Sequence, residues 1–191
     1  MAWLRHAVKD YFRARVEARL NDLTLDAGAS YLQARRMVAG LGPADQGNLM
    51  EVWYRARHAT GAQAHQMHRV TRTSGDNKGL VETRVADLVV GREAREVKDI
   101  KGKIDEDQFA AYVDVLEQRT KGQGAPFDKL RYVFTNPEGA MANLEFFAKA
   151  MRDISIQDKL AVEVFDAQGK RHIITTPKEA LTMLATLKVE K

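Results

Sequence analysis

The amino-acid sequence predicts an α/β fold of the α+β type, in which a mixed central β-sheet is flanked by helices and preceded by an N-terminal helical extension. Three observations predict this class. Apolar side chains recur at helical spacing through the first 60 residues. Residues 66–100 instead carry alternating or continuous β-branched residues between glycine-rich turns. From residue 105 onward, helical and extended patterns alternate, which is the order of a sheet covered by helices.

The first 43 residues are expected to form an N-terminal helical segment, and residues 44–191 a second, larger domain. Apolar spacing predicts one helix over residues 4–20 and another over residues 31–38. Gly40-Leu41-Gly42-Pro43 is a turn whose proline is placed to begin the next helix. The apolar side of that helix consists of Leu49, Val52, Trp53 and Ala56.

The following segments alternate between strands and helices. Strands are expected over residues 66–73, 80–90 and 94–100, and the short turns between them predict a three-stranded meander. A helix follows over residues 105–120, with Asp105 as its cap and Phe109, Tyr112, Val113 and Leu116 on its apolar side. The last elements are expected to be a strand over 130–134, a helix over 138–152, a hairpin of strands 160–165 and 172–175, and a helix over 177–187.

Composition limits the class of partner and of compartment. Lysine plus arginine (30) exceed aspartate plus glutamate (26), and the sequence pI is about 9.3, so the mildly positive field suits a polyanionic partner. A net charge of +4 is also common in proteins that never bind nucleic acid, so the charge only supports other evidence. The absence of cysteine excludes disulfides and thiolate zinc sites and fits a cytosolic site of action. No apolar stretch approaches the ~18 residues that span a bilayer, so no membrane insertion is expected.

A carboxylate in an apolar strand is the first candidate site residue. Asp87 lies within Val85-Ala86-Asp87-Leu88-Val89-Val90, where an unpaired charge would cost several kcal/mol. Further along the chain, Glu96 and Lys98 point to the same face of the next strand, because side chains alternate with a period of two, and Val97 points into the core. If the turn at Gly91 makes these strands neighbours, Asp87 and Glu96 approach closely enough to share a divalent cation.

This set of side chains indicates metal-dependent phosphodiester chemistry. Mg²⁺ prefers oxygen ligands and is usually bound by one or two carboxylates together with water and substrate phosphate, and Mn²⁺ is the alternative ion. The metal would polarise the scissile phosphate and lower the pKa of a bound water, while Lys98 orients that water or balances charge on the pentavalent phosphorus. We therefore expect an enzyme that hydrolyses phosphodiester bonds.

The residues Asp87 and Glu96-Val97-Lys98, within a helix, three-strand, helix, strand order, resemble the motif of the PD-(D/E)XK nuclease superfamily over roughly residues 44–135. The resemblance implies a restriction-endonuclease-like core and an endonuclease that cleaves DNA in preference to RNA. It also implies that Glu51, on the preceding helix, joins Asp87 and Glu96 in the metal site, and that Gln108 is the polar residue near the lysine. Ala86 stands where the family motif often has proline, a position that carries no chemistry.

Basic residues near the motif are candidates for substrate binding. Lys101 and Lys103 follow the strand of Glu96 and are placed to contact substrate phosphates, although a solvated loop explains them equally well. Arg69 and Arg72, on the first strand, are weaker alternatives.

Three histidines are candidate metal ligands. His65 and His68 are near each other in the sequence, but neither they nor His58 have a third ligand at convincing spacing. We interpret them as ordinary histidines.

The biological setting follows only from a looser resemblance. Compact, basic, cysteine-free modules of this superfamily with a helical lead-in are similar to the C-terminal toxin domains that bacteria deliver into competitors, often neutralised by an acidic immunity protein. This implies an antibacterial effector that acts in the cytoplasm of a target cell after delivery as part of a larger secreted protein. Three alternatives stay open: a housekeeping or mobile-element nuclease, a non-catalytic nucleic-acid- or protein-binding module on the same fold, and a helical interaction protein in which residues 1–60 act.

Overall fold

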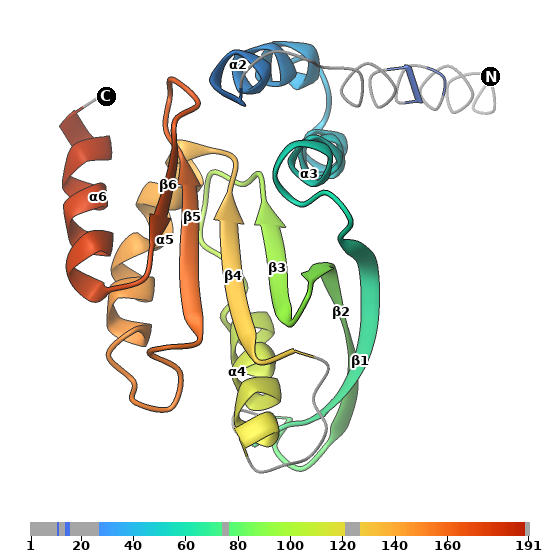
Figure 1. Ribbon diagram of the computed structural model, residues 1–191, viewed down its shortest axis with the longest axis vertical. Coiled ribbons are helices and arrows are strands. Elements are labelled where there is room, and N and C mark those ends of the chain that lie inside the picture. Colours follow the sequence, from blue (N-terminus) through green and yellow to red (C-terminus); the bar gives the residue numbers. More distant parts are fainter. Residues whose placement is uncertain (1–10, 12–13, 16–26, 74–76, 121–126, 190–191) are drawn as a thin grey trace.

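A computed structural model describes residues 27–73, 77–120 and 127–189, together with residues 11, 14 and 15 (Figure 1). Within these residues a six-stranded mixed sheet is flanked by five helices. The expected α+β class with a mixed central sheet is therefore confirmed. The helix predicted over residues 4–20 falls almost entirely outside the described residues.

The six strands lie side by side in the order in which they occur in the sequence. The first three form the expected antiparallel meander, the fourth and fifth join it in parallel, and the sixth closes the expected hairpin with the fifth. Gly91 turns the chain between the second and third strands with a φ of +61°, as the first central residue of a type II′ turn requires. The strands are β1 (Gln63–Thr71), β2 (Val81–Val90), β3 (Glu93–Lys98), β4 (Lys129–Phe134), β5 (Leu160–Phe165) and β6 (Arg171–Ile174).

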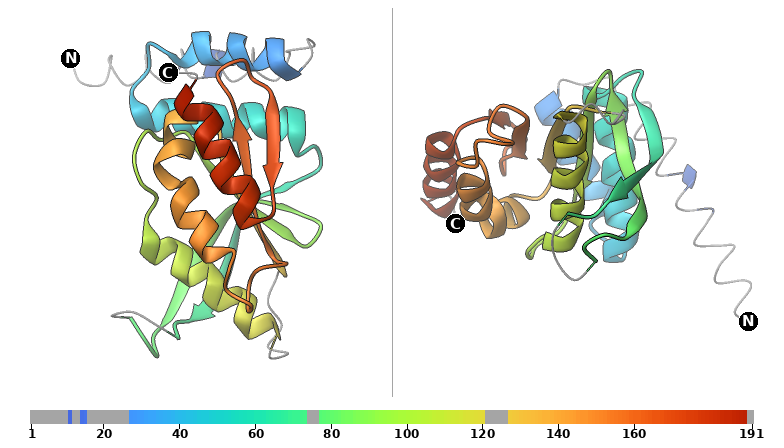
Figure 2. Two further views of the ribbon diagram at one scale, coloured as in Figure 1. Left: turned by 90° about the vertical axis from the view of Figure 1, so that its left-hand side faces the viewer. Right: turned by 90° about the horizontal axis from the view of Figure 1, so that it is seen from below.

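Helices cover both faces of the sheet (Figure 2). Parallel neighbours require crossover connections, and α4 (Glu106–Thr120) links β3 to β4 while α5 (Pro137–Ala150) links β4 to β5. These two helices and α6 (Pro177–Val189) pack on one face, whereas α2 (Ala27–Val38) and α3 (Pro43–His58) pack on the other. The sheet is thus the middle of three layers. None of the described helices is long and apolar enough to cross a membrane.

Local signals begin the helices close to the predicted positions. Asn136 caps α5 by accepting the backbone N–H of Glu138 at 3.0 Å. Asp105 caps α4 by accepting the backbone N–H groups of Asp107 and Gln108 at 2.9 and 3.2 Å. The cap predicted at Asp105 is confirmed, and it fixes the start of the helix that carries Gln108.

The helix α2 shares a core with α3 and the sheet. Tyr31 stacks on Phe165 of β5 with ring centroids 5.7 Å apart, and its hydroxyl donates to the carbonyl of Thr135 at 2.9 Å. Arg35 forms an ion pair with the buried carboxylate of Asp99, the residue directly after β3. The domain boundary at residue 43 stays a prediction, but the described helices on either side of it bury side chains in one cluster.

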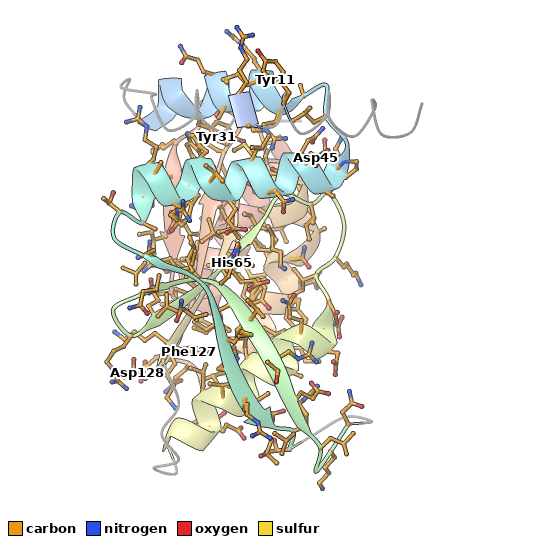
Figure 3. All side chains as sticks on the ribbon, turned by 90° about the vertical axis from the view of Figure 1, so that its right-hand side faces the viewer. Tyr11, Tyr31, Asp45, His65, Phe127 and Asp128 are labelled. Atoms are coloured by element: carbon orange, nitrogen blue, oxygen red, sulfur yellow. The ribbon has the colours of Figure 1, made fainter. Side chains whose placement is uncertain are left out.

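The strands β1 and β2 extend past α3 as a two-stranded ribbon with α4 behind it (Figure 3). The fully buried guanidinium of Arg72 ties the ribbon to this helix by ion pairs with Glu82 of β2 and with Asp107 and Asp114 of α4. Arg72 as a phosphate contact is therefore wrong, because carboxylates already surround it. Arg69 is exposed and, by strand alternation, points to the opposite face of the ribbon.

Candidate active site

The strands β2 and β3 pair at three positions, from Val90 opposite Glu93 to Leu88 opposite Arg95. Just beyond the last of these pairs, the backbone N–H of Val97 donates to Asp87 Oδ2 at 2.9 Å. The carboxylate thus takes the place of a backbone acceptor at the point where β2 leaves β3. The expectation that the Gly91 turn makes neighbours of the two strands is confirmed.

At this same position along the strands, the side chains of β1 and β2 that pack in the core switch from one face of the sheet to the other. Ala64 and Leu88 are paired across β1 and β2 and pack with α3, whereas Val70 and Ala86 pack in the cluster that contains α4. Residues an even number apart on one strand normally share a face, so the facing reverses along both strands. In β1 the reversal coincides with His65, whose φ of +50° is the only positive value at a non-glycine residue in the described chain. In β2 it falls between Ala86 and Leu88, at the position of the site carboxylate.

Glu96 is the centre of a hydrogen-bonded cluster. Its side chain is almost fully buried, and its Oε1 accepts from Lys98 Nζ at 2.6 Å and from Gln108 Nε2 at 2.7 Å. Its Oε2 accepts from the Tyr112 hydroxyl at 2.6 Å. Lys98 also donates to Gln108 Oε1 at 3.1 Å. The structure therefore brings Glu96, Lys98 and Gln108 together, and three donors fix the orientation of the carboxylate.

Tyr112 is also a member of this cluster, although its spacing in the sequence predicted only a place on the apolar side of the helix. Its ring is buried and lies against those of Phe127 and Tyr132, but its hydroxyl reaches Glu96. The available signal was spacing, because Gln108 and Tyr112 are separated by one helical turn and so share a face of α4.

Three carboxylates influence one another at the site. Burial is the main cause that raises the pKa of Asp87 to about 7, and the charges of Glu96 and Glu51 raise it further. The Val97 N–H and the Lys98 ammonium oppose this rise with smaller effects. Burial also raises the pKa of Glu51, and the neighbouring Glu96 adds to that rise. Glu51, contributed by α3, is therefore an electrostatic neighbour of both other acids.

The three histidines lie in different surroundings. Burial lowers the pKa of His58 to about 4, and its ring packs against that of Phe165. His68 is buried, and its ring lies 5.9 Å from that of Tyr112. His65 is exposed and has its Nε2 3.2 Å from Glu51 Oε1 (Figure 3). Of the three, His65 alone makes a described polar contact with a predicted site residue.

The two predicted phosphate-binding lysines lie on the loop between β3 and α4. Lys101 and Lys103 are both exposed, and Lys101 Nζ lies 3.7 Å from Glu138 Oε2. Asn143 of α5 fixes this loop by accepting the N–H of Ile104 and donating to the carbonyl of Gly102, each at 2.9 Å. A substrate role for the two lysines stays a prediction.

The chemistry of the acidic residues fits a divalent cation. Carboxylate oxygens are the ligands that Mg²⁺ and Mn²⁺ prefer. The charges of Glu96 and Glu51 help to raise the pKa of Asp87, and a bound cation would oppose that rise. No group of three or more His, Asp or Glu side chains within the described ranges is arranged to hold a metal ion. The fit is therefore to two carboxylates, Asp87 and Glu96, with Glu51 as an electrostatic neighbour.

No family model, curated protein or solved structure matches this chain. The resemblance to the PD-(D/E)XK superfamily stays an expectation from the motif and the order of elements.

Proposed function

We propose that this protein is a metal-dependent endonuclease with a restriction-endonuclease-like core. The observation that carries the proposal is that Asp87 accepts the backbone N–H of Val97, the residue between Glu96 and Lys98, and interacts electrostatically with both of their side chains. An acidic pair next to a fixed ammonium group is suited to stabilise and cleave a phosphodiester, because charge develops on the phosphate oxygens during attack.

Asp87 and Glu96 would hold Mg²⁺ or Mn²⁺, with Glu51 as the third acidic residue. When bound, the ion supplies Lewis-acid activation of the scissile phosphate and lowers the pKa of a bound water. Gln108 and Tyr112 hold Glu96 from both of its oxygens, so the direction of its remaining lone pairs is set before any ligand arrives. Asp87 contributes its negative charge only after it loses its proton.

Lys98 is the candidate catalytic cation. Its ammonium is held by Glu96 and by Gln108, and 19% of its side chain remains exposed to solvent. An ammonium fixed in this way either orients the attacking water or balances the negative charge that forms on phosphorus. Gln108 keeps the lysine beside the acid and away from other surface positions.

Nucleic acid as substrate is supported by the phosphodiester chemistry of the site and by the net charge of +4. DNA in preference to RNA, a toxin role and an acidic immunity protein follow only from the resemblances. Expression of the chain in a bacterium distinguishes a toxin from a housekeeping or mobile-element nuclease. Toxicity that Glu96→Ala abolishes supports an effector, whereas a tolerated active enzyme supports a housekeeping or mobile-element nuclease.

The direct test is to incubate the purified chain with plasmid DNA and with tRNA, in Mg²⁺ or Mn²⁺ and then in EDTA. We expect cleavage that depends on the ion and that falls by more than about 100-fold in Glu96→Gln, beyond the 10–100-fold typical of residues that only support a ligand. Glu145→Gln, on the exposed side of α5, is the matched control and should cleave normally. Metal-independent binding without cleavage of either polymer would instead support the non-catalytic module.

A further inference from the structure

His65 has a backbone conformation that strand residues rarely adopt. Its φ is +50°, and non-glycine residues held in that region tend to occur at functional sites, where the surroundings maintain the strain. Pairing of Ala64 with Leu88 and of Gln66 with Ala86 places His65 opposite Asp87. The kink therefore lies at the level of the candidate active site.

Neighbouring groups support the kink. Gln66 Nε2 donates to the carbonyl of Ala64 at 3.0 Å, so a side chain satisfies the acceptor that directly precedes the distorted residue. Histidine also enters the left-handed region more readily than β-branched or bulky residues. The distortion is thus specified by the local sequence and has its own hydrogen bond.

The kink brings the imidazole to α3. His65 Nε2 lies 3.2 Å from Glu51 Oε1, and the Glu51 side chain is 18% exposed whereas that of His65 is 67% exposed. Because His65 is mostly exposed, its contact with the mostly buried Glu51 is not needed to fill the core. The contact instead fixes the side chain of an acid that interacts with both other site carboxylates.

We propose that His65 is a positioning residue that holds the Glu51 carboxylate where its negative charge adds to those of Asp87 and Glu96, the two acids that would bind a divalent cation. This inference rests on the proposed function. Hydrogen-bonding partners of metal ligands orient those ligands and typically change metal affinity by 10–100-fold. His65 itself does not touch the substrate in this assignment.

The test measures binding of Mn²⁺ alone to the purified full chain by calorimetric titration. His65→Gly keeps the positive φ without strain and removes only the imidazole, so we expect a folded protein whose Kd for Mn²⁺ rises about tenfold or more. Gln63→Gly, at another exposed position of β1, controls for glycine in this strand and should leave the Kd unchanged. His65→Asn is a second variant that tolerates the kink with a shorter side chain, and the same loss is expected.

A double-variant cycle identifies the partner. If His65 acts through Glu51, His65→Gly causes no further loss of Mn²⁺ affinity once Glu51→Gln is present. Unchanged affinity in the single His65 variants, or an equal loss in the Glu51→Gln background, overturns the inference while the nuclease proposal stands. If the unaltered chain neither binds Mn²⁺ nor cleaves nucleic acid, the proposed function is wrong and the role of His65 fails with it.

Discussion

At the scale of single residues, the site combines two acids that are held by different kinds of donor. Glu96 accepts hydrogen bonds from three side chains, whereas Asp87 accepts one from the backbone N–H of Val97. The pKa of Asp87 is raised to about 7, so near neutral pH a cation that binds as proposed would have to displace the proton of this carboxyl. Ion binding is therefore expected to strengthen as the pH rises through neutrality.

A substitution of Asp87 tests, without any metal, how much its buried charge costs in stability. The pKa of Asp87 is about 7 in the folded protein against 3.8 for the ordinary group, so the folded state retains a proton that the unfolded chain has released. The contribution of Asp87 to stability is then most favourable below pH 3.8, falls as the pH rises from 3.8 to about 7, and levels above that. Asp87→Asn carries no such charge and still offers an oxygen to the Val97 N–H.

We expect Asp87→Asn to melt at a higher temperature than the unaltered protein at pH 8 in EDTA, and to show little advantage at pH 4. Thermal unfolding followed by circular dichroism at both pH values measures the difference. Asp158→Asn, at an exposed position, controls for the change of side chain. A variant that is less stable at pH 8 would contradict an energetically costly charge at Asp87.

Two buried tyrosines offer a matched comparison of hydroxyl groups. Tyr112→Phe removes the donor to Glu96 Oε2, so we expect metal-dependent cleavage to fall by roughly 10–100-fold. Tyr132→Phe removes a buried hydroxyl that has no hydrogen-bond partner among the described residues, so cleavage should be retained and stability equal or greater. Initial rates on plasmid DNA and melting temperatures distinguish the two, and equal losses of activity would remove Tyr112 from the site.

At the scale of elements, the sequence predicted the strands, which follow a periodic residue pattern, and missed a kink that depends on a single torsion angle. Alternating apolar residues located the strands that carry Asp87 and Glu96, and their glycine turn established that they are neighbours. The kink at His65 was not predictable, because one positive φ leaves no periodic trace in the residues around it. The burial of Arg72 was missed for a related reason: its partners come from α4, and alternation along one strand does not show which face a later helix will cover.

Substitution by alanine is expected to have opposite effects on stability at two helical glycines. A Cβ at Gly139 of α5 would lie 2.2 Å from the carbonyl oxygen of Ile100, so Gly139→Ala must push apart the helix and the loop after β3. A Cβ at Gly47 of α3 meets nothing within 4 Å, so Gly47→Ala should stabilise by about 0.5–1 kcal/mol through helix propensity alone.

Gly139→Ala is therefore expected to destabilise by roughly 1–3 kcal/mol, as overpacking of a close contact does, and to lower nuclease activity, because the displaced loop leads from Lys98 to Gln108. Urea unfolding of both variants gives the free energies, and cleavage rates give the effect on the site. Stabilisation by both alanines would show that α5 does not approach the loop this closely.

At the scale of the whole molecule, α2 is joined to the same strand that carries the site. Arg35 pairs with Asp99, whose side chain is fully buried and which directly follows Lys98. Tyr31 covers Phe165 and binds the carbonyl of Thr135, beside the end of β4. A helix from the segment expected to be separate thus closes the sheet over the ends of three parallel strands.

This arrangement predicts that the chain does not divide cleanly at residue 43. A fragment of residues 44–191 would leave the Asp99 carboxylate without its ion pair with Arg35. Loss of Tyr31, Ala34 and Val38 would expose apolar surface of the same core. We therefore expect residues 27–191 to fold cooperatively and cleave, and residues 44–191 to unfold at much lower urea and to lose activity. Arg35→Ala in the longer fragment removes only the ion pair and should reproduce only part of this loss. Equal urea midpoints for the two fragments would instead mean that α2 is an appendage and that the core is complete without it.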